Sequence, residues 1–105
     1  EVVRLLCEAG ADKDKSTNVG NTPLSIAATK GNLEMVRLLC EAGADKDKVP
    51  EPGMPTPLFS ASELGHADVA RYLCEAGADR DKARLDGATP LFVASQEGQS
   101  EVVRL

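Results

Sequence analysis

The sequence has 105 residues, 42% of them hydrophobic and 28% charged, as expected of a single globular unit. Aromatic residues make up only 3%, so a core must be built mainly from Leu, Val and Ala. The net charge is −5 without any basic stripe, and apolar runs are only a few residues long, so neither nucleic-acid binding nor membrane insertion is expected.

The best-defined elements are two short helices joined by a glycine turn. A Thr-Pro pair at the start and Gly31 at the end predict a helix over Pro23–Lys30, because Thr caps free N–H groups and Pro fits the first turn. Asn32 is a good cap for a second helix, and apolar residues at helical spacing predict it from Leu33 to Ala42. The polar stretch that follows is expected to form an extended, hairpin-like loop.

The same order of elements recurs along the chain. Thr-Pro-Leu occurs three times, and so does Ala-Gly-Ala-Asp, whose copies are 33 and 34 residues apart. A fixed period of this size indicates a stack of repeats, and such stacks build extended binding surfaces rather than enclosed active sites. The copies are Ala9–Asp12, Ala42–Asp45 and Ala76–Asp79.

One cysteine occupies the same register in each repeat, on the apolar side of the second helix: Cys7, Cys40 and Cys74. Neighbouring helix pairs lie about 10 Å apart, whereas a disulfide needs Cα atoms within about 7 Å. We therefore expect buried free thiols, which suit a reducing, intracellular and cytoplasmic location. No Cys-x-x-Cys spacing exists, so no metal site is expected.

The pattern Thr-Pro-Leu-x-x-Ala-Ala-x-x-Gly from Thr22 to Gly31, followed by Val-x-Leu-Leu and Ala-Gly-Ala-Asp, closely resembles the ankyrin repeat. The resemblance covers the whole chain. It implies an all-α repeat solenoid, in which ankyrin-type helix-turn-helix units are joined by projecting β-hairpin-like loops. It divides the single domain 1–105, as an excerpt of a longer array, into the second helix of a partial repeat (1–13), a full repeat (14–46), a full repeat with a one-residue loop insertion (47–80) and a truncated repeat (81–105).

Two departures from the family pattern concern aromatic and imidazole side chains. The usual His after Thr-Pro-Leu is replaced by Ser25, Phe59 and Phe92, and we expect both phenylalanines to pack between adjacent first helices. His66 stands where the family usually has His at the helix–helix turn, so the resemblance implies a structural residue that bonds loop backbone. No nucleophile or acid recurs with it and no Gly-rich phosphate motif is present, so neither an enzyme nor a cofactor is expected.

The alternating charges at Asp12–Lys15 and Asp45–Lys48 suggest a calcium loop at first sight. An EF-hand loop needs Gly at its sixth position and Glu at its twelfth, and from Asp12 these positions hold Thr17 and Pro23. The motif therefore fails. We expect solvated loop edges in which acids and bases alternate.

The loop Val49–Pro55 holds three prolines and is one residue longer than its neighbours. Because proline fixes φ and removes a donor, its tip is expected to be stiff and to lack a regular strand pair. Two interpretations stay open. The loop is either a specialised contact point with Met54 as an exposed anchor, or a tolerated surface insertion.

The resemblance implies partner binding on the concave side, formed by loop tips and the exposed edge of the first helices. These positions differ between repeats, whereas the packing positions stay alike. Val19, Met54, Leu64 and Leu85 are expected to form an apolar patch centred on Met54 and Leu64, with an acidic rim that favours a basic partner. The full set is Asn18, Val19, Asn21, Thr29, Lys30, Glu51, Pro52, Met54, Glu63, Leu64, Leu85, Asp86, Ala88, Gln96 and Glu97.

Together these features predict a non-catalytic protein–protein interaction module. Two other functions stay open: a structural spacer or scaffold segment of a long solenoid, and the targeting arm of a larger enzyme or channel. Uncapped apolar faces at the ends of the stack also predict self-association.

Overall fold

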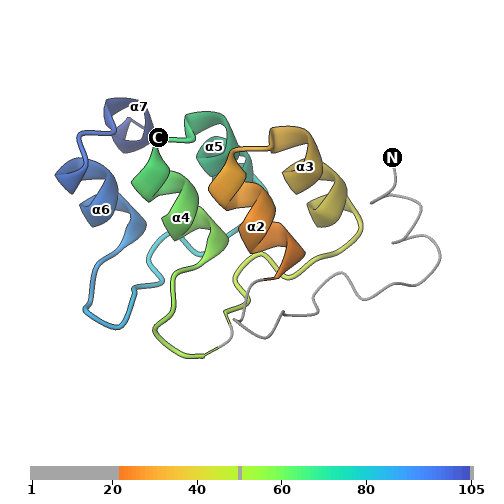
Figure 1. Cartoon of the computed structure of the whole chain (residues 1–105), viewed down its shortest axis with the longest axis horizontal. Coiled ribbons are helices and arrows are strands. Elements are labelled where there is room, and N and C mark those ends of the chain that lie inside the picture. The colour runs from red at the N-terminus through yellow and green to blue at the C-terminus, as the bar shows by residue number, and fades with distance from the viewer. Residues whose placement is uncertain (1–21, 50, 105) are drawn as a thin grey trace.

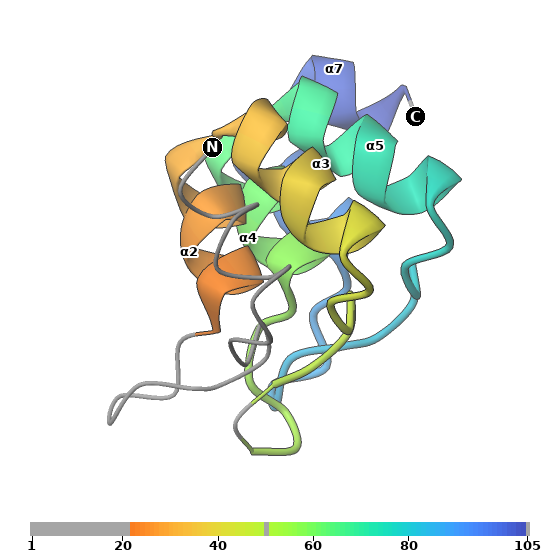
Figure 2. The same ribbon diagram turned by 90° about the vertical axis from the view of Figure 1, so that its right-hand side faces the viewer.

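The helices form two parallel layers in the computed structural model, which describes residues 22–49 and 51–104. Helices α2, α4 and α6 make one layer and α3, α5 and α7 the other. The loops before α4 and α6 both project beyond the helices on the same side, at the bottom of the views (Figures 1 and 2). No strand occurs within the described ranges, and the predicted all-α repeat solenoid is confirmed. The helices are α2 (Pro23–Lys30), α3 (Leu33–Glu41), α4 (Pro57–Leu64), α5 (Ala67–Glu75), α6 (Pro90–Gln96) and α7 (Ser100–Val103).

Each helix of the first layer begins at the same threonine cap. The threonine Oγ1 accepts a hydrogen bond from the backbone N–H three residues later, over 3.1 to 3.2 Å, and proline occupies the first turn, where its missing N–H costs nothing. The helix predicted over Pro23–Lys30 has the predicted bounds. The capping residues are Thr22, Thr56 and Thr89.

The second layer starts directly after a glycine turn. Gly31 and Gly65 end α2 and α4 in the left-handed conformation, with φ of 72° and 78°. Asn32 then caps α3, since its Oδ1 accepts the N–H of Met35 over 3.1 Å. The helix predicted from Leu33 to Ala42 ends one residue earlier, because Ala42 is its C-cap.

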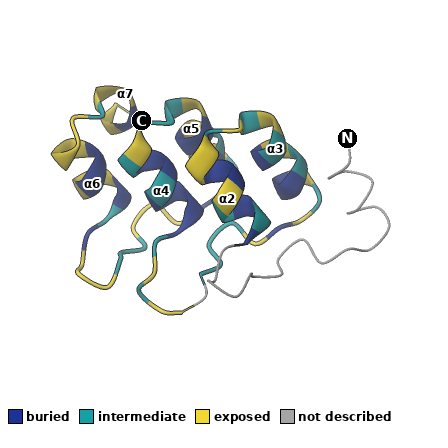
Figure 3. Ribbon diagram, in the orientation of Figure 1, coloured by how far each residue is buried: buried dark blue, intermediate teal, exposed yellow. Residues whose placement is uncertain are grey.

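The core lies between the two layers and combines small and large residues. Ala28, Ala61, Ala70 and Ala94 are fully buried, which lets neighbouring helices approach closely. Figure 3 shows burial concentrated along the helices and exposure at the loop tips. The larger members of this core are Leu24, Val36, Leu39, Leu58, Val69 and Leu73.

Side chains at the glycine turns connect each repeat to the one before it. The His66 Nε2 lies 3.0 Å from the Thr29 carbonyl oxygen, and the Gln99 Nε2 donates to the Glu63 carbonyl over 3.1 Å. Since a carbonyl only accepts, Nε2 of His66 carries the shared proton. His66 thus bonds backbone, as expected, but the acceptor lies in the last turn of α2 in the preceding repeat and not in a loop.

The Asp-Lys runs make a second connection, on the loop side. Asp47 accepts twice from the next such run, Asp79–Lys82: its Oδ1 accepts the Asp79 N–H over 3.0 Å, and its carbonyl accepts the Lys82 Nζ over 2.9 Å. Asp45 and Asp79 also accept from the N–H two residues later in their own runs. The expectation of merely solvated loop edges was therefore wrong for Asp47, whereas Asp12–Lys15 lies outside the described residues.

The cysteines are free thiols with different degrees of burial. Cys40 is buried as expected, but Cys74 is only half-buried, and Cys7 lies outside the described residues. Cys74 of α5 lines a cavity together with Val102 and Val103 of the four-residue helix α7. Burial raises the pKa of both described thiols, which keeps them protonated and weakly nucleophilic.

Candidate functional site

The candidate surface consists of two loop tips and the last turns of three first-layer helices. We call it the tip surface. Asn18, Val19 and Asn21 lie outside the described residues, and of the other predicted positions Glu63 is half-buried and Ala88 buried. The exposed positions, which with Glu63 make up the tip surface, are Thr29, Lys30, Glu51, Pro52, Met54, Leu64, Leu85, Asp86, Gln96 and Glu97.

Three apolar side chains of the tip surface are open to solvent. Met54 is 42%, Leu64 49% and Leu85 87% exposed. The backbone N–H of Leu85 donates to the Gly53 carbonyl over 2.6 Å, so the loop of Met54 meets the loop of Leu85. Leu64 ends α4, about 10 Å along the helix axis from the loop that enters it. The contact between the two loops thus joins Gly53, which precedes Met54, to Leu85, and the apolar patch centred on Met54 and Leu64 stays a prediction.

Ala88 does not belong to the tip surface, which corrects the sequence prediction. Its N–H donates to the Asp86 Oδ1 over 3.1 Å, and its carbonyl accepts the Arg84 N–H over 2.8 Å. This turn buries Ala88, only 7% exposed, against Phe59 and Val93.

Phe59 and Phe92 occupy the same repeat position but different environments. Phe59 is 1% exposed and packs against Val93 of α6, as predicted. Phe92 is 57% exposed, so its predicted packing was wrong: within the described residues no further first-layer helix follows α6.

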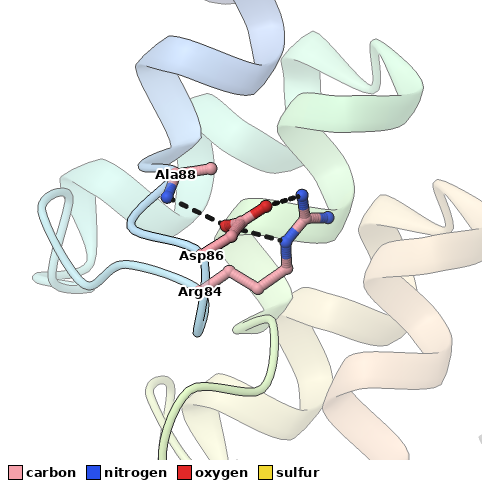
Figure 4. Close-up of polar contacts among 3 residues, drawn as sticks. All are labelled: Arg84, Asp86 and Ala88. Carbon is pink, nitrogen blue, oxygen red and sulfur yellow. Dashed lines mark hydrogen bonds and ion pairs between the residues drawn. The ribbon is translucent and has the colours of Figure 1, made fainter.

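Arg84 is the residue of this region that sequence reasoning missed. Its guanidinium lies 4.9 Å from the centre of the Phe59 ring and holds the Asp86 carboxylate with two hydrogen bonds, from Nε over 3.2 Å and from Nη2 over 2.6 Å. Figure 4 shows Arg84, Asp86 and Ala88 joined within one turn. The Asp86-Gly87 dipeptide signals a turn in the sequence. Nothing in the sequence pairs Arg84 with a ring 25 residues earlier.

The Arg84–Asp86 pair makes the stability of the fold depend on pH. The Arg84 hydrogen bonds, followed by the Ala88 N–H, hold the pKa of Asp86 below its ordinary value. A carboxyl whose pKa is lower in the folded chain stabilises the fold above the unfolded pKa of about 3.9, and this contribution is lost as pH falls through the folded value. We expect NMR titration to place the pKa of Asp86 below its ordinary value of about 3.9, and Arg84→Gln to raise this pKa toward that value. An Asp86 pKa that is the same in both proteins would contradict the pairing.

Acidic side chains predominate on the tip surface. Glu51, Asp86 and Glu97 are exposed and Glu63 is half-buried, whereas Lys30 is the one cation of this surface and Arg84 lies beside it. Within the described ranges, Asp86 is the one of these four acids that forms an ion pair. The surface can therefore offer apolar contact and unneutralised carboxylates.

The described part of the chain has neither a metal-ligand cluster nor a membrane-spanning helix. It contains no group of three His, Cys, Asp or Glu side chains placed to hold a metal ion. None of its helices is long and apolar enough to cross a membrane.

Comparison with known proteins identifies the repeat. A family model described as ankyrin repeats (3 copies) matches residues 1–49 and again residues 48–105. No curated protein matches the chain.

Proposed function

Because the chain belongs to the ankyrin repeat family, whose members are generally protein–protein interaction modules, we propose that it binds a partner protein on the tip surface. We take this surface to be the concave side on which the resemblance to the family implies docking. The proposal includes no catalytic step.

One observation carries the assignment to this face. The residues that build the fold, such as the threonine caps and the buried alanines, have the same role in each repeat. The residues of the tip surface, in contrast, differ from repeat to repeat. Lys30, Leu64 and Glu97 occupy one equivalent position and are a cation, an apolar residue and an acid, all exposed. Such variation on a fixed frame supports recognition over a spacer role, in which near-identical tips would suffice.

Replacing both Met54 and Leu64 with Ser tests the assignment. Loss of apolar contact on the tip surface is expected to weaken binding of an affinity-captured, purified partner by about tenfold or more. Isothermal titration calorimetry measures the change. The control replaces Glu34 and Arg71, exposed on α3 and α5, with Ser and is expected to bind normally. Equal affinity of all three proteins would refute binding on the tip surface.

We further propose self-association through the end of the stack at α6 and α7. Leu91, Phe92 and Val103 are 59%, 57% and 41% exposed there, next to a cavity of about 220 Å³ lined by side chains that include Leu58 and Val102. Stacking of a second copy would cover these apolar groups. Sedimentation equilibrium is expected to show association that Leu91→Ser with Phe92→Ser abolishes. A chain that stays monomeric at high concentration would contradict this proposal.

We also propose an intracellular, cytoplasmic location. The free thiols of Cys40 and Cys74 support it, because cysteines remain reduced in that compartment. A disulfide-linked form in protein isolated without reductant would argue against it.

A further inference from the structure

Two loop tips meet on the tip surface, and we infer that their junction binds a protein segment in which an apolar side chain stands beside lysine or arginine. We call the junction the tip clasp and define it as Gly53, Met54, Arg84, Leu85 and Asp86. The inference rests on the proposed function, because it names the partner chemistry and the point of contact on that same surface.

The clasp is a close backbone contact between neighbouring repeats. Besides the 2.6 Å hydrogen bond from Leu85 to Gly53, a Cβ built on Gly53 would lie 3.0 Å from the Leu85 Cβ and 3.1 Å from its Cα. Gly53 also has a φ of 90°, which side-chain-bearing residues rarely adopt. Glycine therefore permits the contact, and Met54, the next residue, is held close to Leu85.

Leu85 is fixed from its own loop as well. Arg84 donates its N–H to the Ala88 carbonyl over 2.8 Å, and Gly87 donates to the Arg84 carbonyl over 2.8 Å. The Asp86 carboxylate ties the Arg84 side chain to the Ala88 backbone. The Leu85 side chain nevertheless remains 87% exposed. A large apolar group on a backbone that is already ordered loses little conformational entropy when it binds, which suits it to anchor a partner.

The charges around the clasp select a basic partner. The Arg84 guanidinium already stacks on the Phe59 ring and forms an ion pair with Asp86. Asp86 and, more weakly, Glu63 raise the pKa of the Arg84 guanidinium, so the Glu63 carboxylate lies within the electrostatic reach of the clasp. Glu51 is exposed three residues before Met54, and its carbonyl accepts the Met54 N–H over 3.2 Å. Neither Glu51 nor Glu63 forms an ion pair with another described residue, so both remain to attract lysine or arginine.

The test uses the full chain and a displayed library of short random peptides. Peptides selected on the unchanged protein are expected to be enriched in Lys or Arg next to Leu, Ile, Phe or Met. Fluorescence anisotropy then measures their affinity for two variants. Leu85→Ser is expected to weaken binding about tenfold, and Glu51→Gln with Glu63→Gln about threefold, with a flatter dependence on salt in the second case.

Each variant has a matched control outside the tip surface. Ile26→Ser replaces an exposed apolar side chain of α2, and Glu34→Gln with Glu75→Gln replaces two exposed acids on α3 and α5. Both controls are expected to bind the peptides as the unchanged protein does. Thermal unfolding of Leu85→Ser should also be unchanged, since this side chain is outside the core.

The outcomes separate this inference from the proposed function. Selected peptides rich in Asp or Glu, or full affinity for Leu85→Ser, would overturn the clasp as the site. If Lys30→Ser or Glu97→Ser then weakened binding of the same peptides, the tip surface would still be the binding face. If no substitution on the tip surface weakened binding of the selected peptides, or if the library gave no binder, both the clasp and the proposed function would be refuted.

Discussion

Replacing Phe59 with Ala is expected to lower the free energy of unfolding by about 3–5 kcal/mol. The side chain is 1% exposed, packs against Ala88 and Val93 of the next repeat, and lies under the Arg84 guanidinium. Its removal leaves a cavity between two repeats and frees Arg84 from its ring contact. Urea unfolding followed by circular dichroism measures the loss, a large share of the roughly 5–15 kcal/mol typical of a domain.

Phe92→Ala is the matched control, because Phe92 occupies the same position one repeat later and is 57% exposed. Its replacement should cost less than about 1 kcal/mol. Losses of similar size for Phe59→Ala and Phe92→Ala would show that repeat position, rather than packing against the next repeat, sets the contribution.

The second large effect is expected from Leu73→Ala, at about 2–5 kcal/mol. Leu73 is fully buried in α5, in one core with Leu39 of α3 and Val102 of α7. Truncation would leave a cavity in the second layer that the short, rigid helices cannot close. Thermal unfolding should show a clearly lower midpoint.

Two controls isolate the cavity as the cause. Leu73→Met preserves most of the volume and should cost less than about 1.5 kcal/mol. Leu64→Ala removes a leucine that is 49% exposed and should leave stability nearly unchanged. A loss in Leu73→Met as large as in Leu73→Ala would contradict the assignment to lost volume.

The elements of one repeat could be predicted because their signals are local. The Thr-Pro start and Gly31 stop gave the bounds of α2, and the end of α3 was misplaced by one residue, since Ala42 caps the helix that it was expected to end. The division into repeats at 13/14, 46/47 and 80/81 remains a prediction.

Contacts between segments that stacking brings together could not be predicted from the sequence. Whether Asp47 is solvated or accepts the Asp79 N–H depends on how two loops stack, and no local rule contains that geometry. The same holds for Ala88, whose position in the repeat suggested exposure but which the Arg84–Asp86 turn directs toward Phe59. In the candidate site, the exposure of Met54 and Leu85 followed from loop position, whereas their junction at Gly53 required the stacked structure.

The side-chain connections along the stack also bear on how the chain folds. They join residues 32 to 37 positions apart, from Asp47 and Asp79 at the lower limit to Thr29 and His66 at the upper. Because the entropy of loop closure depends on this separation, each added repeat meets the same closure cost as the one before it. Folding that starts in any pair of neighbouring repeats can therefore propagate in either direction without a rising kinetic barrier.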